Sequence, residues 1–180
     1  MSVTGQPDPD TRAEFLKGMS LAACTVNIVT TDGAAGRFGA TVSAMSSVSA
    51  DGEWPTLLVC MHHNVSATPA IIENGHFCVN VLRDDQVAIS DGFARRTAIT
   101  DGDKFSCATW SGGRYGQPHI VGALARFECR LQSKQQVGTH FVFIGEVLHV
   151  ETEAAGSPLI YSNRAYGTLG RLSETAAATA

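Results

Sequence analysis

The sequence has no apolar run that approaches the roughly 18 residues of a membrane-spanning helix. Its first residues, MSVTGQPDPDTR, lack the basic and apolar regions of a secretory signal. Positive charge is scarce as well, because 13 Lys and Arg residues stand against 17 Asp and Glu residues, for a net charge of −4. Surfaces that bind nucleic acid or anionic membranes need clustered Lys and Arg. We therefore expect a cytoplasmic protein with no nucleic-acid or membrane partner, which meets any anion at a local site.

Motifs for metal binding and nucleophilic catalysis are also missing. The five cysteines contain no CxxC pair and are an odd number, so we interpret them as small apolar fillers. His62 and His63 are adjacent, and neighbouring residues of a strand point to opposite faces, so we expect no metal site. No GxSxG motif is present, and the run GAAGRFG at residues 33–39 lacks the spacing of a dinucleotide loop. These absences argue against a hydrolase and a Rossmann protein.

The composition favours one globular domain. A chain of 180 residues with 44% hydrophobic residues can bury a substantial core. We expect a flexible N-terminal tail over residues 1–10, a single domain over residues 11–170 and a C-terminal tail over residues 171–180. The run Thr-Arg-Ala-Glu at residues 11–14 matches a capping box, and Phe15, Leu16, Met19 and Ala23 form an apolar stripe. The pattern predicts an amphipathic helix over residues 11–22.

Most of the remaining pattern is typical of β-strands. Alternating and β-branched runs, separated by turn residues, predict strands at residues 24–31, 38–46, 56–62, 76–82, 123–136, 139–153 and 157–162. Short helices are predicted over residues 69–73 and, capped by Asp84, over residues 85–93. No period extends through residues 94–119, which we interpret as a long functional loop. The expected fold class is mainly β, with about six strands in one closed or nearly closed barrel and short peripheral helices.

One strand-like run is unusually rich in hydroxyl groups. The run TVSAMSSVSA at residues 41–50 interleaves five Ser and Thr residues with small apolar side chains. Hydroxyl groups and backbone amides on a β framework can donate several hydrogen bonds to a phosphate without much positive charge. The small neighbouring side chains allow a flat ring to approach the backbone. We therefore interpret this run as part of a binding site and its serines as ligand-binding groups.

Four blocks of the sequence resemble a known family. These blocks are VNIVTTDGAAGRFGATVSAMSSVS, LLVCMHHNVSATPAIIENGHFCVNVL, GTHFVFIGEV and PLIYSNRAYGTL, in this order. Together they resemble the short-chain flavin reductases of two-component monooxygenases, over residues 15–169. The resemblance implies a Greek-key split β-barrel of the FMN-binding, flavin reductase type, and a homodimer. It further implies an oxidoreductase that uses NADH or NADPH to reduce FMN or FAD and releases the reduced flavin to a separate monooxygenase.

The resemblance also implies site residues. The segment expected around the flavin ring, ribityl chain and phosphate contains Thr41, Ser43, Ala44, Ser46 and Ser47. A second loop on the phosphate side contains Asn64 and Ser66, and Phe93 and Arg95 are expected over the flavin or its adenylate tail. His140 corresponds to the histidine of a Gly-Asp-His signature on the nicotinamide side, and Tyr166 belongs to the closing Tyr-Arg-Leu segment. No metal is implied.

Two positions depart from the family pattern. Thr139 stands where an aspartate is usual, and its hydroxyl can still form a hydrogen bond with the histidine. Gly167 stands where an arginine is usual, so a charge contact is expected to be missing there. Other roles remain open for the site residues, since Thr41 and Ser43 suit solvent-facing strand positions, and Asn64 and Ser66 suit a helix cap.

Hydride transfer between stacked rings needs positioning more than a nucleophile. His140 would therefore orient or polarise the reactants, and the loop over residues 94–119 would act as a gate. Two alternatives stay open at this point. One is a flavoprotein that retains FMN and carries electrons, and the other is a non-catalytic flavin- or haem-binding barrel. The choices between FMN and FAD and between NADH and NADPH are open too.

Overall fold

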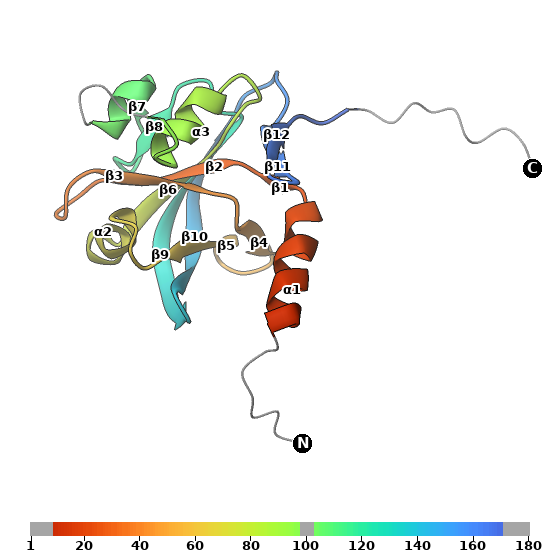
Figure 1. The fold of residues 1–180 in the computed structure, drawn as a ribbon. Helices are drawn as coiled ribbons and strands as arrows, with labels where there is room; N and C mark the ends of the chain where they lie inside the picture. Colours follow the sequence, from red (N-terminus) through yellow and green to blue (C-terminus); the bar gives the residue numbers. More distant parts are fainter. Residues whose placement is uncertain (1–8, 98–102, 171–180) are drawn as a thin grey trace, which may run out of the picture.

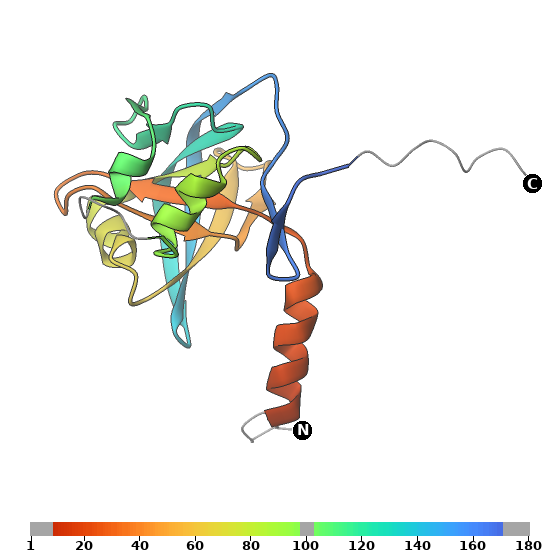
Figure 2. The same cartoon turned by 45° about the horizontal axis from the view of Figure 1, so that its top comes forward.

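A computed structural model of the chain describes residues 9–97 and 103–170 (Figure 1). Its centre is one strongly curved antiparallel sheet, with strand order β3-β2-β6-β9-β10-β5-β4. The strands are β2 (Asn27–Thr31), β3 (Phe38–Val42), β4 (Met45–Ser49), β5 (Thr56–His62), β6 (His76–Val81), β9 (Ala125–Val137) and β10 (His140–Thr152). Short helices lie around this sheet (Figures 1 and 2). The expected mainly β class is confirmed.

The strand order shows how the sheet closes. Strands β3 and β4 lie at opposite ends of the order, yet only Ser43 and Ala44 separate them in the chain. The chain from Val42 to Met45 spans at most about 11 Å, so the end of β3 and the start of β4 lie close together. The amide of Cys60 donates to the carbonyl of Ala44 at 3.0 Å, which ties this link to β5. The result is a split barrel with seven strands in the main sheet, in agreement with the roughly six predicted.

The long hairpin of β9 and β10 follows the predicted alternation. Its register pairs Val137 with His140, and Gly138 at the turn has a φ of 56°, in the left-handed region that favours glycine. Side chains that alternate along the strands fill the barrel. The buried set includes Val29, Val42, Leu57, Val59, Met61, Phe77, Val79, Cys129 and Phe143. This interior is the main hydrophobic core.

The described part of the chain has three α-helices, which lie outside the barrel: α1 (Pro9–Leu21), α2 (Ala67–Asn74) and α3 (Val87–Phe93). Helix α1 begins two residues before the predicted start, so Thr11 lies inside it and the predicted capping box is wrong. Residues 9 and 10 of the expected tail belong to this helix, while residues 1–8 and 171–180 lie outside the described residues. Gly75 ends α2 with a φ of 70°, as expected from Asn-Gly. Gln86, rather than Asp84, occupies the N-cap position of α3.

The predicted long loop contains regular structure. Within residues 103–119 lie a 3-10 helix η1 (Lys104–Cys107), β7 (Trp110–Gly112) and the start of β8 (Pro118–Ile120). Elements of three or four residues are too short to show a period in the sequence, so the prediction of an irregular segment was wrong here. Phe105 and Ile120 join a second core with Phe93 of α3. This core covers the outer face of the barrel.

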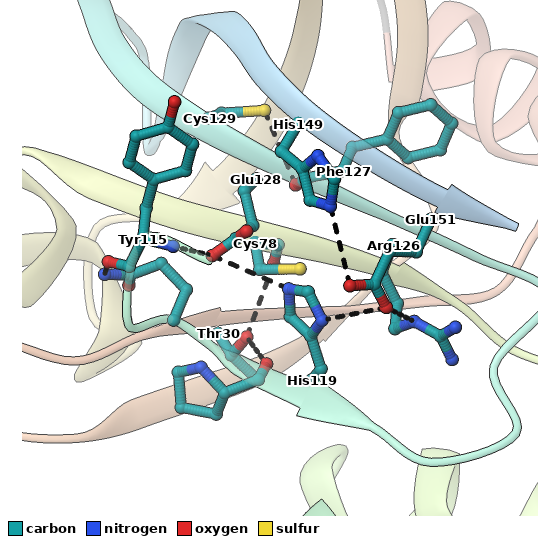
Figure 3. Close-up of polar contacts among 12 residues, drawn as sticks. Thr30, Cys78, Tyr115, His119, Arg126, Phe127, Glu128, Cys129, His149 and Glu151 are labelled. Atoms are coloured by element: carbon teal, nitrogen blue, oxygen red, sulfur yellow. Dashed lines mark hydrogen bonds and ion pairs between the residues drawn. The ribbon is translucent and has the colours of Figure 1, made fainter. Parts of the chain in front are cut away.

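Strand β8 lies on the barrel over a buried polar layer (Figure 3). Thr30 donates to the carbonyl of Pro118 at 2.7 Å, and Asn80 accepts from the amide of Ile120 at 2.8 Å. The imidazole of His119 lies 3.6 Å from a carboxylate oxygen of Glu128 and 3.6 Å from one of Glu151. Polar side chains of β2, β6, β9 and β10 therefore hold β8 in place.

A small additional sheet pairs a strand near the N-terminus with two strands near the C-terminus. It contains β1 (Cys24–Thr25), β11 (Ile160–Ser162) and β12 (Ala165–Gly167). The strand at β11 was predicted, whereas β12 was not. Figure 1 shows this sheet at the base of α1, which extends away from the barrel. No helix among the described residues is both long and apolar enough to cross a membrane.

Candidate active site

A hollow of about 570 Å³ opens between the barrel and the outer core. It lies where β3, the segment between β5 and α2, the end of α3 and the start of η1 meet. Its lining residues come from four separated stretches: Arg37, Phe38, Gly39, Ala40 and Thr41; Asn64, Val65 and Ser66; Phe93, Ala94 and Arg95; Asp103, Lys104 and Phe105. Only tertiary folding brings these stretches together.

One wall of the hollow is aromatic. The rings of Phe93 and Phe105 meet edge to face with centroids 5.2 Å apart, and Trp110 packs against both. Gly39 permits this wall, because a Cβ atom added there would lie 2.6 Å from the ring of Phe93. The absence of a side chain on Gly39 thus lets an aromatic ring contact the backbone of β3.

Three cations, Arg37, Arg95 and Lys104, also line the hollow, with the carboxylate of Asp103 in the same lining, and we call this group the basic end. The Arg37 guanidinium lies 4.3 Å from the centroid of the Phe105 ring and 3.9 Å from Asp103. Lys104 donates to the carbonyl of Phe93 at 3.2 Å. Burial, and then the positive charge of Arg95, lower the pKa of Lys104. This basic end, within a chain of net charge −4, is suited to an anion.

The loop before α2 adds neutral polar groups. Ser66 occupies the N-cap position of α2, but its side chain makes no capping hydrogen bond. The sequence left open that Ser66 serves only as a helix cap. Its hydroxyl group does not form that hydrogen bond. Both Asn64 and Ser66 are exposed and line the hollow. The positive end of the α2 dipole also favours an anion at this wall.

Thr41 has a different role in this geometry. Its hydroxyl donates to the carbonyl of Ser90 in α3 at 2.8 Å, so it fixes α3 against β3 while lining the hollow. The Ser90 hydroxyl in turn lies 2.9 Å from the hydroxyl of Tyr166, which donates to Asp91 at 2.7 Å. Burial, and then the hydrogen bond to Asp91, raise the pKa of Tyr166. Tyr166 thus supports α3 from behind the hollow.

Arg96 completes this support and was not predicted. Its guanidinium donates to the hydroxyls of Tyr166 at 3.1 Å and Tyr161 at 3.2 Å. It also lies over both rings, 5.2 Å from the centroid of Tyr161 and 5.6 Å from that of Tyr166. The guanidinium of Arg96 therefore contacts Tyr166. Tyr166 is next to Gly167, the position at which an arginine is usual in the family pattern.

The structure brings together five of the eleven site residues that were predicted from the sequence. Thr41, Asn64, Ser66, Phe93 and Arg95 line the hollow, whereas the other six are not among its lining residues. Ser43 and Ala44 are exposed on the link between β3 and β4, and Ser46 and Ser47 are exposed on β4. Ser47 lines a second hollow of about 420 Å³ along β4 and β5. The roles expected for these four residues remain predictions.

His140 is exposed at the start of β10. The Thr139 hydroxyl lies 3.1 Å from Nδ1 of His140, the contact expected to replace that of the missing aspartate. The His140 ring also lies 5.0 Å from that of His62, whose ring is 4.7 Å from that of His63. The expectation that His62 and His63 point to opposite faces is wrong, because β5 ends at His62 and the alternation ends with it. Across the described residues, no group of three or more His, Cys, Asp or Glu side chains is arranged to hold a metal ion.

Nine of the fourteen lining residues were not predicted, among them the charged or aromatic residues Arg37, Lys104 and Phe105. Arg37 follows the glycine-rich turn, while Lys104 and Phe105 lie in the segment interpreted as a gate. For Lys104 and Phe105, the one available signal was their position in a segment already interpreted as functional, whereas Arg37 lies in a run that was rejected as a dinucleotide loop. A charged or aromatic residue in such a segment gives no periodic pattern from which to infer its direction.

A split barrel that has an outer hollow with an aromatic wall and a basic end is suited to binding a phosphorylated ligand with a flat ring. Comparison with known proteins identifies the class further. Residues 19–170 match the family described as flavin reductase like domain, and the chain belongs to this family.

Similar proteins agree with this assignment. The chain is 39% identical over 158 residues to the FMN reductase (NADH) RutF of Stutzerimonas stutzeri, with 88% of each chain covered. It is 31% identical to BorF, the flavin reductase component of a bacterial two-component tryptophan halogenase, with a TM-score of 0.78 over 89% of this chain and 99% of that one. It is 25% identical to the NADH:FAD oxidoreductase SgcE6 of Streptomyces globisporus, solved with NAD and FAD fragments, with a TM-score of 0.79 over 97% and 100% of the two chains.

Proposed function

We propose that the protein is an NADH-dependent FMN reductase that releases reduced flavin. The observation that carries the proposal is that the aromatic rings of Phe93 and Phe105 line the same hollow as Arg37, Arg95 and Lys104. These residues fit a flavin mononucleotide, whose ring is flat and aromatic and whose phosphate is an anion. The relative named FMN reductase (NADH) supports the choice of both substrates.

The chain's own residues have three tasks in this reaction. Phe93 and Phe105 provide the apolar wall, and Gly39 leaves the β3 backbone accessible beside it. Lys104 and the loop of Asn64 and Ser66 would hold the phosphate. When bound, the flavin supplies the ring that accepts a hydride from the nicotinamide, so the protein needs to orient two substrates and no side chain needs to form a covalent bond. His140, supported by Thr139, would orient the nicotinamide.

We further propose that a separate enzyme, such as a monooxygenase or halogenase, uses the reduced flavin. BorF is described as the reductase component of such a system. Six of the lining residues, Arg37, Asn64, Ser66, Ala94, Arg95 and Asp103, are exposed to solvent, which suits a ligand that enters and leaves. We also propose a cytoplasmic location. All five cysteines are unpaired, as expected in a reducing compartment.

A homodimer is part of the proposal. Three apolar side chains of α1, Phe15, Leu16 and Met19, are 63%, 45% and 52% exposed. Both views show α1 extending from the barrel (Figures 1 and 2). A short helix with an uncovered apolar stripe gains little stability by itself, so a second copy of the chain would bury this surface.

The test is NADH oxidation by the purified protein, followed by absorbance, with no added flavin, FMN, FAD or riboflavin, and with NADPH in parallel. We expect oxidation that requires added FMN and saturates with it. Oxidation without added flavin would instead indicate a flavoprotein that retains its cofactor. If a folded protein oxidised neither nucleotide with any flavin, the reductase proposal would be wrong.

A further inference from the structure

Three histidines meet at the end of β5 and the start of β10. His62 and His140 are direct cross-strand partners, and their rings meet edge to face with centroids 5.0 Å apart. His63 lies edge to face against His62 at 4.7 Å. The amide of His63 also donates to the carbonyl of Thr139 at 2.9 Å. His62 therefore lies between the residue proposed to orient the nicotinamide and the loop that lines the hollow.

His62 is bonded directly to that loop. Its Nδ1 accepts a hydrogen bond from the backbone amide of Asn64 at 3.1 Å. The carbonyl of His62 accepts from the hydroxyl of Thr68 in α2 at 2.9 Å, which fixes its backbone. A ring nitrogen accepts a hydrogen bond only while it carries no proton. The contact with Asn64 thus exists only while Nδ1 of His62 is unprotonated.

We propose that His62 is a positioning residue, which holds Asn64 at the wall of the hollow through an unprotonated Nδ1 and releases it when the imidazole is protonated. This inference rests on the proposed function, because it takes FMN as the ligand of the hollow. It assigns to His62 an effect on flavin binding, separate from the orienting role of His140. FMN affinity then depends on the charge of a side chain that is absent from the lining of the hollow.

The direction of the pH effect follows from the surroundings of His62. Partial burial, and then the positive charges of His63 and His140, lower its pKa from the ordinary value of 6.5. Both of these neighbours are histidines, so protonation of either one disfavours protonation of His62. The unprotonated form is therefore maintained at neutral pH. The contact with Asn64 is present above the lowered pKa and is lost as the pH falls through it.

The experiment compares FMN dissociation constants, measured by flavin fluorescence at about pH 8 and about pH 5, for wild type and three variants. In His62→Asn, the amide oxygen can accept the same hydrogen bond without titrating. In His62→Leu, the acceptor is lost. His63→Asn is the matched control, since it removes a histidine of the cluster whose ring makes no hydrogen bond to Asn64. Comparison with His62→Asn at each pH removes the effect of protonating the FMN phosphate itself.

We expect His62→Leu to bind FMN about 3- to 10-fold more weakly than wild type at the higher pH, the usual effect of one lost hydrogen bond. His62→Asn and His63→Asn should match wild type there. At the lower pH, wild type should lose several-fold more affinity than His62→Asn. If wild type and His62→Asn weaken in parallel, or if His62→Leu binds normally, this inference is wrong while the proposed function stands.

A wild-type protein that binds no FMN would overturn the proposed function, and this inference with it. Nitrogen NMR of the histidine side chains provides a readout without flavin. Nδ1 of His62 should be unprotonated at about pH 8 and should titrate at a lower pH than a free histidine. A protonated Nδ1 in the neutral ring would contradict the inference directly.

Discussion

At the scale of single residues, the phosphate of a bound flavin has two possible sets of partners. The family resemblance assigns it to Ser46 and Ser47, which are exposed on β4. The geometry of the hollow favours Lys104, which lines it together with Arg95. Burial and the positive charge of Arg95 both disfavour the charged form of Lys104. An anion would relieve this unfavourable charge arrangement. The two assignments predict different effects of substitutions on the binding of FMN, which has a phosphate, and of riboflavin, which has none.

We predict that Lys104→Met weakens FMN binding by about 2 kcal/mol, or roughly 30-fold, because a hydrogen bond to a charged group is lost. Riboflavin, which has no phosphate, should bind nearly as well to the variant as to wild type. The measurement is fluorescence titration of both flavins. The paired variant is Ser46→Ala with Ser47→Ala. A selective loss of FMN binding in that variant, and not in Lys104→Met, would place the phosphate at β4.

At the scale of elements, the position of η1 depends on how the hairpin of β7 and β8 packs on the barrel. The two strands are only three residues long and pair with each other alone. Their packing relies on the buried layer in Figure 3, where the side chains of His119 and Glu128 are each 1% exposed. Within the described residues, Nε2 of His119 and Oε2 of Glu128 are buried without a hydrogen bond. The layer therefore defines where β8 lies more than it adds stability.

Gly113 is essential to this packing. A Cβ atom added there would overlap both Glu128 and His119, which are buried and cannot move away. We predict that Gly113→Ala lowers the free energy of unfolding by about 1–3 kcal/mol, the usual cost of overpacking. Urea denaturation of wild type and variant measures this difference in the free energy of unfolding. Gly112→Ala is the control, because nothing lies within 4 Å of a Cβ atom at that position. Equal stability of the two variants would show that the segment rearranges freely.

At the scale of the whole molecule, α1 is the part least explained by one chain. At its C-terminal end, the carbonyl of Ser20 accepts a hydrogen bond from the amide of Asn163 at 2.5 Å, and the carbonyl of Leu21 accepts one from the hydroxyl of Ser162 at 3.5 Å. The apolar stripe on the rest of the helix matches the amphipathic prediction but faces solvent. A homodimer would provide the missing surface.

We predict that wild type is a dimer in light scattering and that Phe15→Glu with Met19→Glu converts it to a monomer, because two carboxylates would be buried without partners. The control is Ala13→Glu with Lys17→Glu, which places carboxylates on the opposite face of the same helix. The control variant should remain dimeric. A monomeric wild-type protein, or a dimer unaffected by the first pair, would show that α1 is not the interface.

The sequence by itself determined the class of fold and the family, and it predicted five residues that line the hollow. Alternation over long stretches, as in β9 and β10, indicates strands whose two faces differ in polarity, so these strands could be predicted. The order and spacing of four blocks pointed to the flavin reductases, and through them to Thr41, Asn64, Ser66, Phe93 and Arg95. Short elements such as β7 and β12 contain too few residues for a period and could not be predicted.

Only the tertiary structure decided which groups share a surface. Arg37 and Lys104 line the same hollow although 66 residues separate them in the chain, because Phe105 of η1 packs on Phe93 of α3, whose ring lies against Gly39 of β3. Likewise, His62 lies beside His140 through the pairing of β5 with β10, and Tyr166 supports α3 from the far end of the chain. Local sequence encodes the direction of a side chain relative to its own strand or helix. Contacts between distant segments depend on the closure of the barrel, which no single segment contains.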